Sequence, residues 1–131
     1  MNKAKYLEDV RLGLLNEIKY QPILEEKFGK LKDLGRYSVL DFEGDDCYIE
    51  LKCYNKSNKN YKYTMIAQNK INKADQVTKD VYFVCVYEEG IFYWKYDKNF
   101  ELIKKKIGRK DRGIYEEKDY CLLPMNLLRK L

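Results

Sequence analysis

The stretch that decides the fold runs from Ser38 to Lys52 and reads SVLDFEGDDCYIELK. Residues 36–42 are rich in strand formers, residues 43–46 form a turn cluster, and residues 47–54 alternate between apolar and polar side chains. This pattern predicts a β-hairpin. Its second strand has an apolar face of Cys47, Ile49, Leu51 and Cys53 and a polar face of Tyr48, Glu50, Lys52 and Tyr54.

The turn decides which side chains of the two strands share a face. With an even number of loop residues, Asp41 lies opposite Tyr48 and therefore diagonal to Glu50 on the same face. A bulge in the turn would move Asp41 to the other face, so this prediction is conditional on the turn. In the even case, two carboxylates and the Lys52 ammonium gather on one face of the hairpin.

Two carboxylates beside an amine suit a hard divalent cation. Mg²⁺ takes oxygen ligands and usually combines one or two carboxylates with substrate phosphate oxygens. An ammonium beside them can orient a water molecule or neutralise charge that develops on the phosphoryl group. The same residues also fit an ordinary hairpin with a solvated acidic turn and an exposed Glu50–Lys52 pair, because Glu-x-Lys is a common tripeptide.

The arrangement of Asp41, Glu50 and Lys52 resembles the motif of the PD-(D/E)xK nuclease superfamily. In that superfamily an Asp on one strand and a (D/E)-x-K on the next bind Mg²⁺ for phosphodiester hydrolysis. The proline before the Asp is absent here, because Leu40 stands in its place, but many members lack it. The resemblance implies a Mg²⁺ site made of Asp41, Glu50 and the backbone carbonyl of Leu51, with Mn²⁺ as an alternative cation. Lys52 would position the water.

The N-terminal segment, residues 4–21, predicts an amphipathic helix that Pro22 interrupts or kinks. Glu17 lies at the edge of its apolar stripe, and a half-buried Glu needs a partner. One reading pairs it with a nearby surface Lys. The resemblance implies another, because many members carry a Glu on the first helix, so Glu17 is predicted as an additional acid and metal ligand. The resemblance also gives Gln68 and Lys70 a supporting role for the catalytic Lys or a phosphate.

The remaining patterns predict an α/β (α+β) fold in one domain of residues 1–131. A buried strand at residues 81–87 follows a helix at residues 64–78, so it should run parallel to residues 47–52. The other predicted elements are a short helix at 23–28 ending at Gly29, a tight turn at 88–90, strands at 91–97, 100–103 and 120–123, and a tail at 124–131. The tail leucines are expected to pack on the core or on a second subunit in a homodimer. The order α-β-β-α-β, with additional C-terminal strands, matches a restriction-endonuclease-like core, a mixed central sheet flanked by helices.

Composition removes several kinds of chemistry. The chain has no His, which excludes histidine-based acid–base catalysis, His-ligated zinc and His–Me nucleases. Any hydrolysis must therefore depend on carboxylates and Lys. The net charge of +5 favours an anionic partner. The four cysteines form no C-x-x-C pair, so we expect small buried residues in a reduced compartment.

We also expect a soluble, intracellular protein with no membrane partner, because the sequence shows no signal-peptide core and no apolar run of membrane length. The size and tail resemble those of small single-domain superfamily members from phages and large DNA viruses. If the chain is viral, the compartment would be the cytoplasm, or the nucleus or viral factory.

Two basic segments are predicted to contact nucleic acid, because amines beside tyrosines suit phosphate contacts and base stacking. Residues 51–74 contain six Lys and no acid, and residues 104–113 contain six basic residues and one Asp. Residues 108–113 have the glycine flanks of a loop that can approach a backbone. The predicted contacts are Lys56, Lys59, Lys62, Lys73, Lys104, Lys105, Arg109, Lys110 and Arg112. The alternative is a solvated surface, or pairing with acids at 116, 117 and 119.

Together these features predict a Mg²⁺-dependent nuclease whose substrate is nucleic acid, with a DNA endonuclease as the specific expectation. The first alternative is a catalytically inactive nucleic-acid-binding module with the same fold, and the second is a protein whose basic patches meet an acidic partner. The joint presence of Asp41, Glu50 and Lys52 favours the enzyme.

Overall fold

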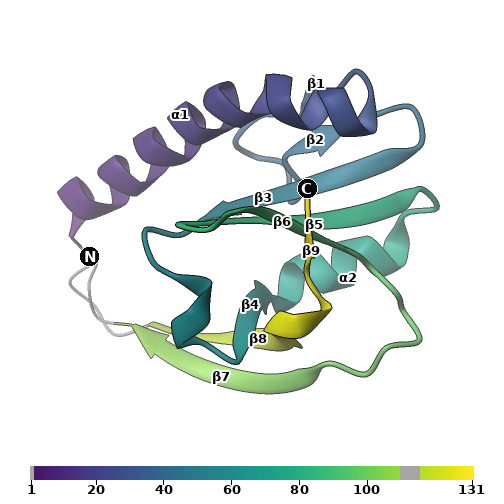
Figure 1. The fold of residues 1–131 in the computed structure, drawn as a ribbon. Helices are drawn as coiled ribbons and strands as arrows, with labels where there is room; N and C mark the ends of the chain where they lie inside the picture. Colours follow the sequence, from purple (N-terminus) through teal and green to yellow (C-terminus); the bar gives the residue numbers. More distant parts are fainter. Residues whose placement is uncertain (1, 110–115) are drawn as a thin grey trace.

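The computed structural model describes residues 2–109 and 116–131, and its central feature is a six-stranded mixed sheet (Figure 1). The strand order is β1–β2–β3–β5–β6–β9. These strands are β1 (Lys32–Asp33), β2 (Phe42–Glu43), β3 (Cys47–Cys53), β5 (Asp80–Tyr87), β6 (Gly90–Lys95) and β9 (Arg129–Lys130). Strands β3 and β5 run parallel, as predicted, and the other neighbours are antiparallel.

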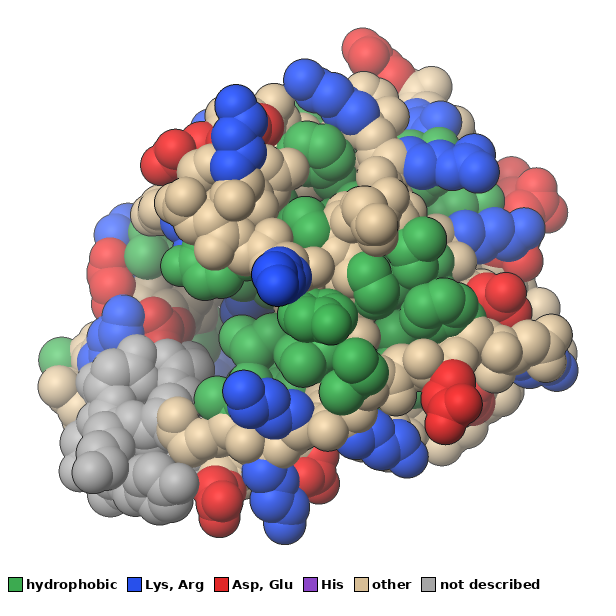
Figure 2. Space-filling view, turned by 60° about the horizontal axis from the view of Figure 1, so that its bottom comes forward, with side chains coloured by type: hydrophobic (Ala, Val, Ile, Leu, Met, Phe, Trp, Pro, Cys, Tyr) green, Lys and Arg blue, Asp and Glu red, His purple; other side chains and the backbone are tan. Residues whose placement is uncertain are grey.

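A second, three-stranded antiparallel sheet lies on one side of the first (Figure 1). Its order is β4 (Tyr63–Ala67), β8 (Glu116–Pro124) and β7 (Ile103–Arg109). Seen from that side, apolar side chains occupy the middle of the surface, and Lys and Arg side chains lie around them (Figure 2).

Two helices complete the layers. Helix α1 (Lys3–Phe28) lies over one face of the larger sheet, and α2 (Gln68–Gln76) lies on the opposite side with the smaller sheet (Figure 1). Two short 3₁₀ turns, at Asn58–Asn60 and Met125–Leu127, join the strands. This mixed α+β arrangement is restriction-endonuclease-like, as the sequence predicts.

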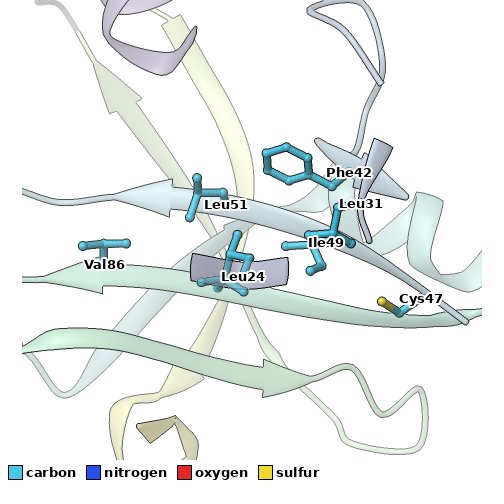
Figure 3. Close-up of a cluster of buried hydrophobic side chains, with 8 residues drawn as sticks. Leu24, Leu31, Phe42, Cys47, Ile49, Leu51 and Val86 are labelled. Carbon is cyan, nitrogen blue, oxygen red and sulfur yellow. The ribbon is translucent and has the colours of Figure 1, made fainter. Parts of the chain in front are cut away.

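The larger sheet separates two hydrophobic cores. On the side of α1, Leu24 packs with Ile49 and Leu51 of β3 and with Val84 and Val86 of β5 (Figure 3). The second core lies on the other side and consists of Leu40, Ile66, Ile71, Ala74, Val81, Phe83, Cys121 and Leu123. Because β5 supplies side chains to both cores, its sequence is a continuous apolar run, whereas β3 alternates. The polar face of β3 therefore points toward α2 and the smaller sheet.

The predicted break at Pro22 is wrong, because α1 is one helix of 26 residues with Pro22 inside it. A proline removes the hydrogen bond to the carbonyl four residues earlier, here that of Ile18. Pro22 is exposed and the Ile18 side chain is 70% exposed, so water can reach this face of the helix. The helix ends at Gly29, as predicted, with a φ of 83° that favours glycine.

The predicted hairpin is present, but its first strand and its register differ. Only Phe42 and Glu43 form β2, whereas residues 36–41 lie in turns and bends. Phe42 pairs with Ile49 and Glu43 pairs with Tyr48, so Asp41 lies beside Glu50 and not opposite Tyr48. The register is shifted by two residues, and a shift of two leaves each side chain on the same face of the sheet. Asp41 and Glu50 therefore share a face, as predicted.

Three other predictions need correction. Residues 64–78 are not one helix, because β4 continues directly into α2. Residues 100–103 are not a strand of their own, since β7 begins at Ile103. The tail forms β9, and Leu128 and Leu131 pack against the two cores while Leu127 is 38% exposed. The predicted turn at residues 88–90 is confirmed, and Gly90 has a φ of 135° there.

All four cysteines are free thiols, and Cys47, Cys85 and Cys121 are buried, as predicted from their apolar surroundings. Burial raises the pKa of each of these thiols. Within the described ranges, neither helix has the length and apolar content needed to cross a membrane.

Candidate active site

The candidate site begins at Asp41, the residue directly before β2. The backbone N–H of Asp41 donates to the carbonyl of Ile49 at 3.0 Å, and its carboxylate Oδ2 accepts the N–H of Leu51 at 2.8 Å. The Asp41 carboxylate therefore accepts the hydrogen bond from Leu51 that a backbone carbonyl would accept if β2 were longer. This bond fixes the carboxylate beside β3, on the face that carries Glu50.

Glu50 is a mostly buried carboxylate, with 14% of its side chain exposed. Its Oε1 atom lies 3.4 Å from Nζ of Lys70 on α2. Its Oε2 atom is buried and has no hydrogen-bond partner. Burial and the neighbouring Asp41 charge raise the pKa of Glu50 well above its usual value, and Lys70 only partly offsets them.

Two amines approach these carboxylates from different elements. Lys70 also donates to the carbonyl of Val39, so it links α2 to the loop before Asp41. Lys52 is exposed, two residues after Glu50 on the same face of β3. The sequence predicted Lys70 as a supporting residue, whereas the structure places it in direct contact with Glu50.

Glu17 reaches the same cluster from α1. Its carboxyl is hydrogen-bonded to Asp41 and to Asp33 of β1, and partial burial together with these contacts raises its pKa from 4.5 to about 8. Glu17 therefore faces acids and not a surface Lys. Asp33 is a site residue that sequence reasoning missed. Its carboxylate Oδ1 also accepts the N–H of Gly35 at 2.8 Å, a local turn contact that gives no sign of the tertiary one.

A cleft of about 1030 Å³ lies beside this cluster, between β3 and the smaller sheet. Its lining includes Glu50, Lys52, Gln68 and Lys70, four of the residues predicted from the sequence. Both polar atoms of the Gln68 amide have partners. Its Nε2 atom donates to Asn72 at 2.9 Å, and its Oε1 atom accepts from the thiol of Cys121 at 3.2 Å.

The first basic segment, residues 51–74, continues along the chain from the end of β3 to α2. The Lys56 ammonium lies 5.1 Å from the ring centre of Tyr54 and 4.1 Å from that of Tyr61. Lys59 and Lys62 are exposed, and Lys73 is half-buried on α2. The tyrosines therefore already hold Lys56 through cation–π contacts.

The second basic segment is only partly described. Lys104 and Lys105 lie on β7, so this part is a strand and not a loop, and Gly108 and Arg109 are its last residues. The predicted contacts Lys110 and Arg112 lie outside the described residues. Lys104 pairs with the buried Cys121, whereas Lys105 pairs with Tyr120. Because directly paired residues share a face, Lys104 lies on the inner face of the smaller sheet and Lys105 on its outer face.

Lys106 also lies on the inner face, but it is not among the contacts predicted from the sequence. It pairs with Asp119, two residues before Cys121 on β8. Side chains of a strand alternate between its two faces, which groups Lys106 with Lys104. This signal could be used only after both segments were known to be strands.

Comparison with known protein families gives a match. Residues 30–131 match the family model described as "Phage putative PDDEXK endonuclease". No curated protein and no solved structure matches the chain. The matched segment contains Asp41, Glu50 and Lys52 and excludes α1, so it includes the hairpin motif but not Glu17. The chain therefore belongs to this family and is a PD-(D/E)xK nuclease-like protein.

Proposed function

We propose that this member of the phage PDDEXK endonuclease family is a Mg²⁺-dependent endonuclease that hydrolyses phosphodiester bonds of DNA. The observation that carries the proposal is the closeness of Asp41 to Glu50, whose Oε2 atom is buried without a hydrogen-bond partner. A buried carboxylate oxygen without a hydrogen bond is costly, and a cation ligand is a chemical reason to keep one.

The charges of the cluster fit a divalent cation. If all were ionised, Glu17, Asp33, Asp41 and Glu50 would carry four negative charges against two positive charges from Lys52 and Lys70. Within residues 2–109 and 116–131, no three Asp, Glu, His or Cys side chains form a complete metal-binding group. Mg²⁺ does not need one, because it usually takes one or two carboxylates and completes its shell with water and substrate phosphate oxygens.

Asp41 and Glu50 would hold Mg²⁺, with the carbonyl of Leu51 as a third oxygen. In a strand, the N–H and C=O groups of one residue point to the same edge. Since the Leu51 N–H points to Asp41, its carbonyl points to that same edge, on the side of the residues that precede β2. When bound, Mg²⁺ would polarise the scissile phosphate and offset charge in the transition state.

Lys52 would orient the attacking water and stabilise negative charge on the phosphate, because its exposed ammonium lines the cleft beside Glu50. Lys70 would hold Glu50 in position through its contact with Oε1. The raised pKa of Glu17, about 8, favours its protonated form, and a cation bound at Asp41 would displace that proton. The cleft and the lysines on the inner face of the smaller sheet would contact the DNA backbone.

The test is a cleavage assay with plasmid, linear duplex, single-stranded DNA, branched DNA and RNA, in Mg²⁺, Mn²⁺ or EDTA. We expect cleavage of internal DNA bonds that requires the cation and is lost in Asp41→Asn. Binding without cleavage of any substrate in either cation would support the inactive nucleic-acid-binding module instead. Preferential cleavage of RNA would refute the DNA assignment.

A further inference from the structure

The chain that leaves β3 carries aromatic side chains and lysines away from the candidate active site. Glu50, Lys52 and Tyr54 lie at alternate positions along this part of the chain, and all three line the cleft. Tyr54 continues the strand, because its N–H donates to the carbonyl of Val86 on β5 at 2.8 Å. At about 3.3 Å per residue, it lies about 13 Å from Glu50 along the strand. A few nucleotides of a strand cleaved at Glu50 would therefore reach Tyr54.

Tyr54 begins a row of contacting side chains. Its ring is stacked on that of Tyr87, with the ring centres 4.8 Å apart and the planes at 11°. Its hydroxyl donates to the carbonyl of Met65 on β4 at 3.3 Å. The Lys56 ammonium lies over both Tyr54 and Tyr61. Tyr61 ends this row and is 45% exposed, so its ring is accessible to a flat partner from solution.

The loop that carries Lys56 is fixed to the turn between β5 and β6. Glu89 of that turn accepts the N–H of Asn58 at 2.8 Å and the hydroxyl of Ser57. The N–H of Glu88 donates to the carbonyl of Lys56 at 3.0 Å. Within the described part of the chain, the Lys56 ammonium has no carboxylate partner, so its donors are available to a phosphate. The lysine and the exposed ring are therefore positioned before a substrate binds.

An ammonium beside an exposed tyrosine ring matches a nucleotide whose base is free. The ammonium pairs with the phosphate, and the ring stacks on the base. Inside a duplex, both faces of a base are already stacked on its neighbours, and taking the base out of the stack costs free energy. A tyrosine therefore gains most from a base in an unpaired strand.

We propose that Tyr61 and Lys56 form a subsite for an unpaired nucleotide, a few nucleotides from the bond that is cleaved. The preferred substrates are then single-stranded DNA and the unpaired arms of branched DNA, and not continuous duplex. The inference rests on the proposed DNA cleavage at Asp41 and Glu50, and it adds the class of DNA that this site accepts.

The first test measures binding, in Ca²⁺, of a labelled single-stranded oligonucleotide and of the same sequence as a duplex. Wild type should bind the single strand more tightly. Tyr61→Ala should weaken single-strand binding by about 5- to 100-fold, the loss of one stacked base, and should change duplex binding by less than about 2-fold. Tyr61→Phe keeps the ring and should bind as wild type does. Phe100→Ala is the matched control, because Phe100 is 37% exposed but does not line the cleft, and it should change neither affinity.

The second test measures the salt dependence of single-strand binding. Lys56→Gln should lower the magnitude of the log–log slope by about 0.7, the value for one phosphate contact to a single strand. Lys27→Gln is the control, because Lys27 also lies over a tyrosine, 4.8 Å from the ring centre of Tyr93, but belongs to α1. It should leave the slope unchanged, and an unchanged slope in Lys56→Gln would overturn the subsite.

The two binding tests separate this inference from the nuclease proposal, because neither of them needs cleavage. Equal binding of single strand and duplex by wild type, or unchanged single-strand binding in Tyr61→Ala, would overturn the subsite even if the protein cleaves DNA. A selective loss of single-strand binding in Tyr61→Ala would support the subsite, whether or not the protein cleaves DNA.

Discussion

Glu50→Gln tests the candidate cation site with little change in shape. Gln keeps the size and a hydrogen-bonding oxygen but removes the charge that the buried Oε2 atom would offer to Mg²⁺. With two carboxylates and a backbone carbonyl, we expect weak binding, with a Kd of about 1 mM, because Mg²⁺ relies on water and substrate for its other ligands. The variant should lose most of this affinity.

The expected effect on stability follows from ligand linkage. At about ten times this Kd, Mg²⁺ stabilises the folded state by about 1.4 kcal/mol. An unfolding entropy of about 2.1 cal/mol/K per residue gives about 0.28 kcal/mol/K for 131 residues. The melting temperature of wild type should therefore rise by about 5 °C when Mg²⁺ replaces EDTA, and that of Glu50→Gln should rise by less than about 1 °C.

The assay is thermal unfolding in EDTA and in Mg²⁺ at pH 6 and pH 8. The rise for wild type should be larger at pH 8, because cation binding must displace the protons that the raised pKa values of Glu17 and Glu50 favour. Asp80→Asn is the matched control, since it also breaks an ion pair of 3.4 Å, to Lys95, but outside the site. If Glu50→Gln keeps the full Mg²⁺ effect, the cation does not bind at Glu50.

Three further predictions concern other parts of the site. Lys52→Ala should lower the cleavage rate by about 10² to 10³ at nearly unchanged DNA affinity, the loss typical of one preorganised charge; single-turnover kinetics with a binding assay in Ca²⁺ checks it, and a wild-type rate would contradict the mechanism. In EDTA, the stabilisation from protonated Glu17 should be complete below pH 4.5 and lost as pH rises to about 8, because its folded pKa is the higher one; thermal unfolding of Glu17→Gln should show a flatter pH dependence, and an unchanged one would refute this assignment. Lys104→Ala should lower the log–log salt slope of DNA binding by about one unit, whereas Lys105→Ala on the outer face should not; equal slopes in the two variants would mean that the inner face is not the binding surface.

The larger sheet was predictable because burial on one or two faces is encoded locally. The alternation of β3 shows one apolar face, and the continuous apolar run of β5 shows two, so their parallel packing followed from the helical crossover between them. The shared face of Asp41 and Glu50 was predictable for a similar reason. It depends on whether the register shift is odd or even, and the real shift of two residues preserved it.

The smaller sheet was missed because its first strand has no local boundary. Residues 63–67 read YTMIA and alternate between exposed and buried positions, but they continue into α2 without a glycine or proline. In such a segment the helix pattern of residues 68–76 extends backwards over the strand. Without β4 as a partner, β7 and β8 could not be assigned to a sheet, and residues 104–109 were interpreted only as part of a basic segment.

Tertiary contacts place two further residues at the site: Asp33, which sequence reasoning missed, and Lys70, which it predicted only in a supporting role. Asp33 and Lys70 lie 17 residues before and 20 residues after Glu50, with turn and strand-to-helix contexts that explain each of them locally. Both residues nevertheless reach the acidic cluster. Lys70 is a partner of Glu50, and Asp33 is a partner of Glu17. The opposing effects of these two residues matter for function, because Lys70 neutralises part of the acidic cluster while Asp33 adds to its charge. With its carboxylates ionised, the site has an excess of negative charge, and Lys70 contacts only one of the two Glu50 oxygens. A divalent cation at the other oxygen would offset that excess. Repulsion among the carboxylates is therefore part of the driving force for cation binding.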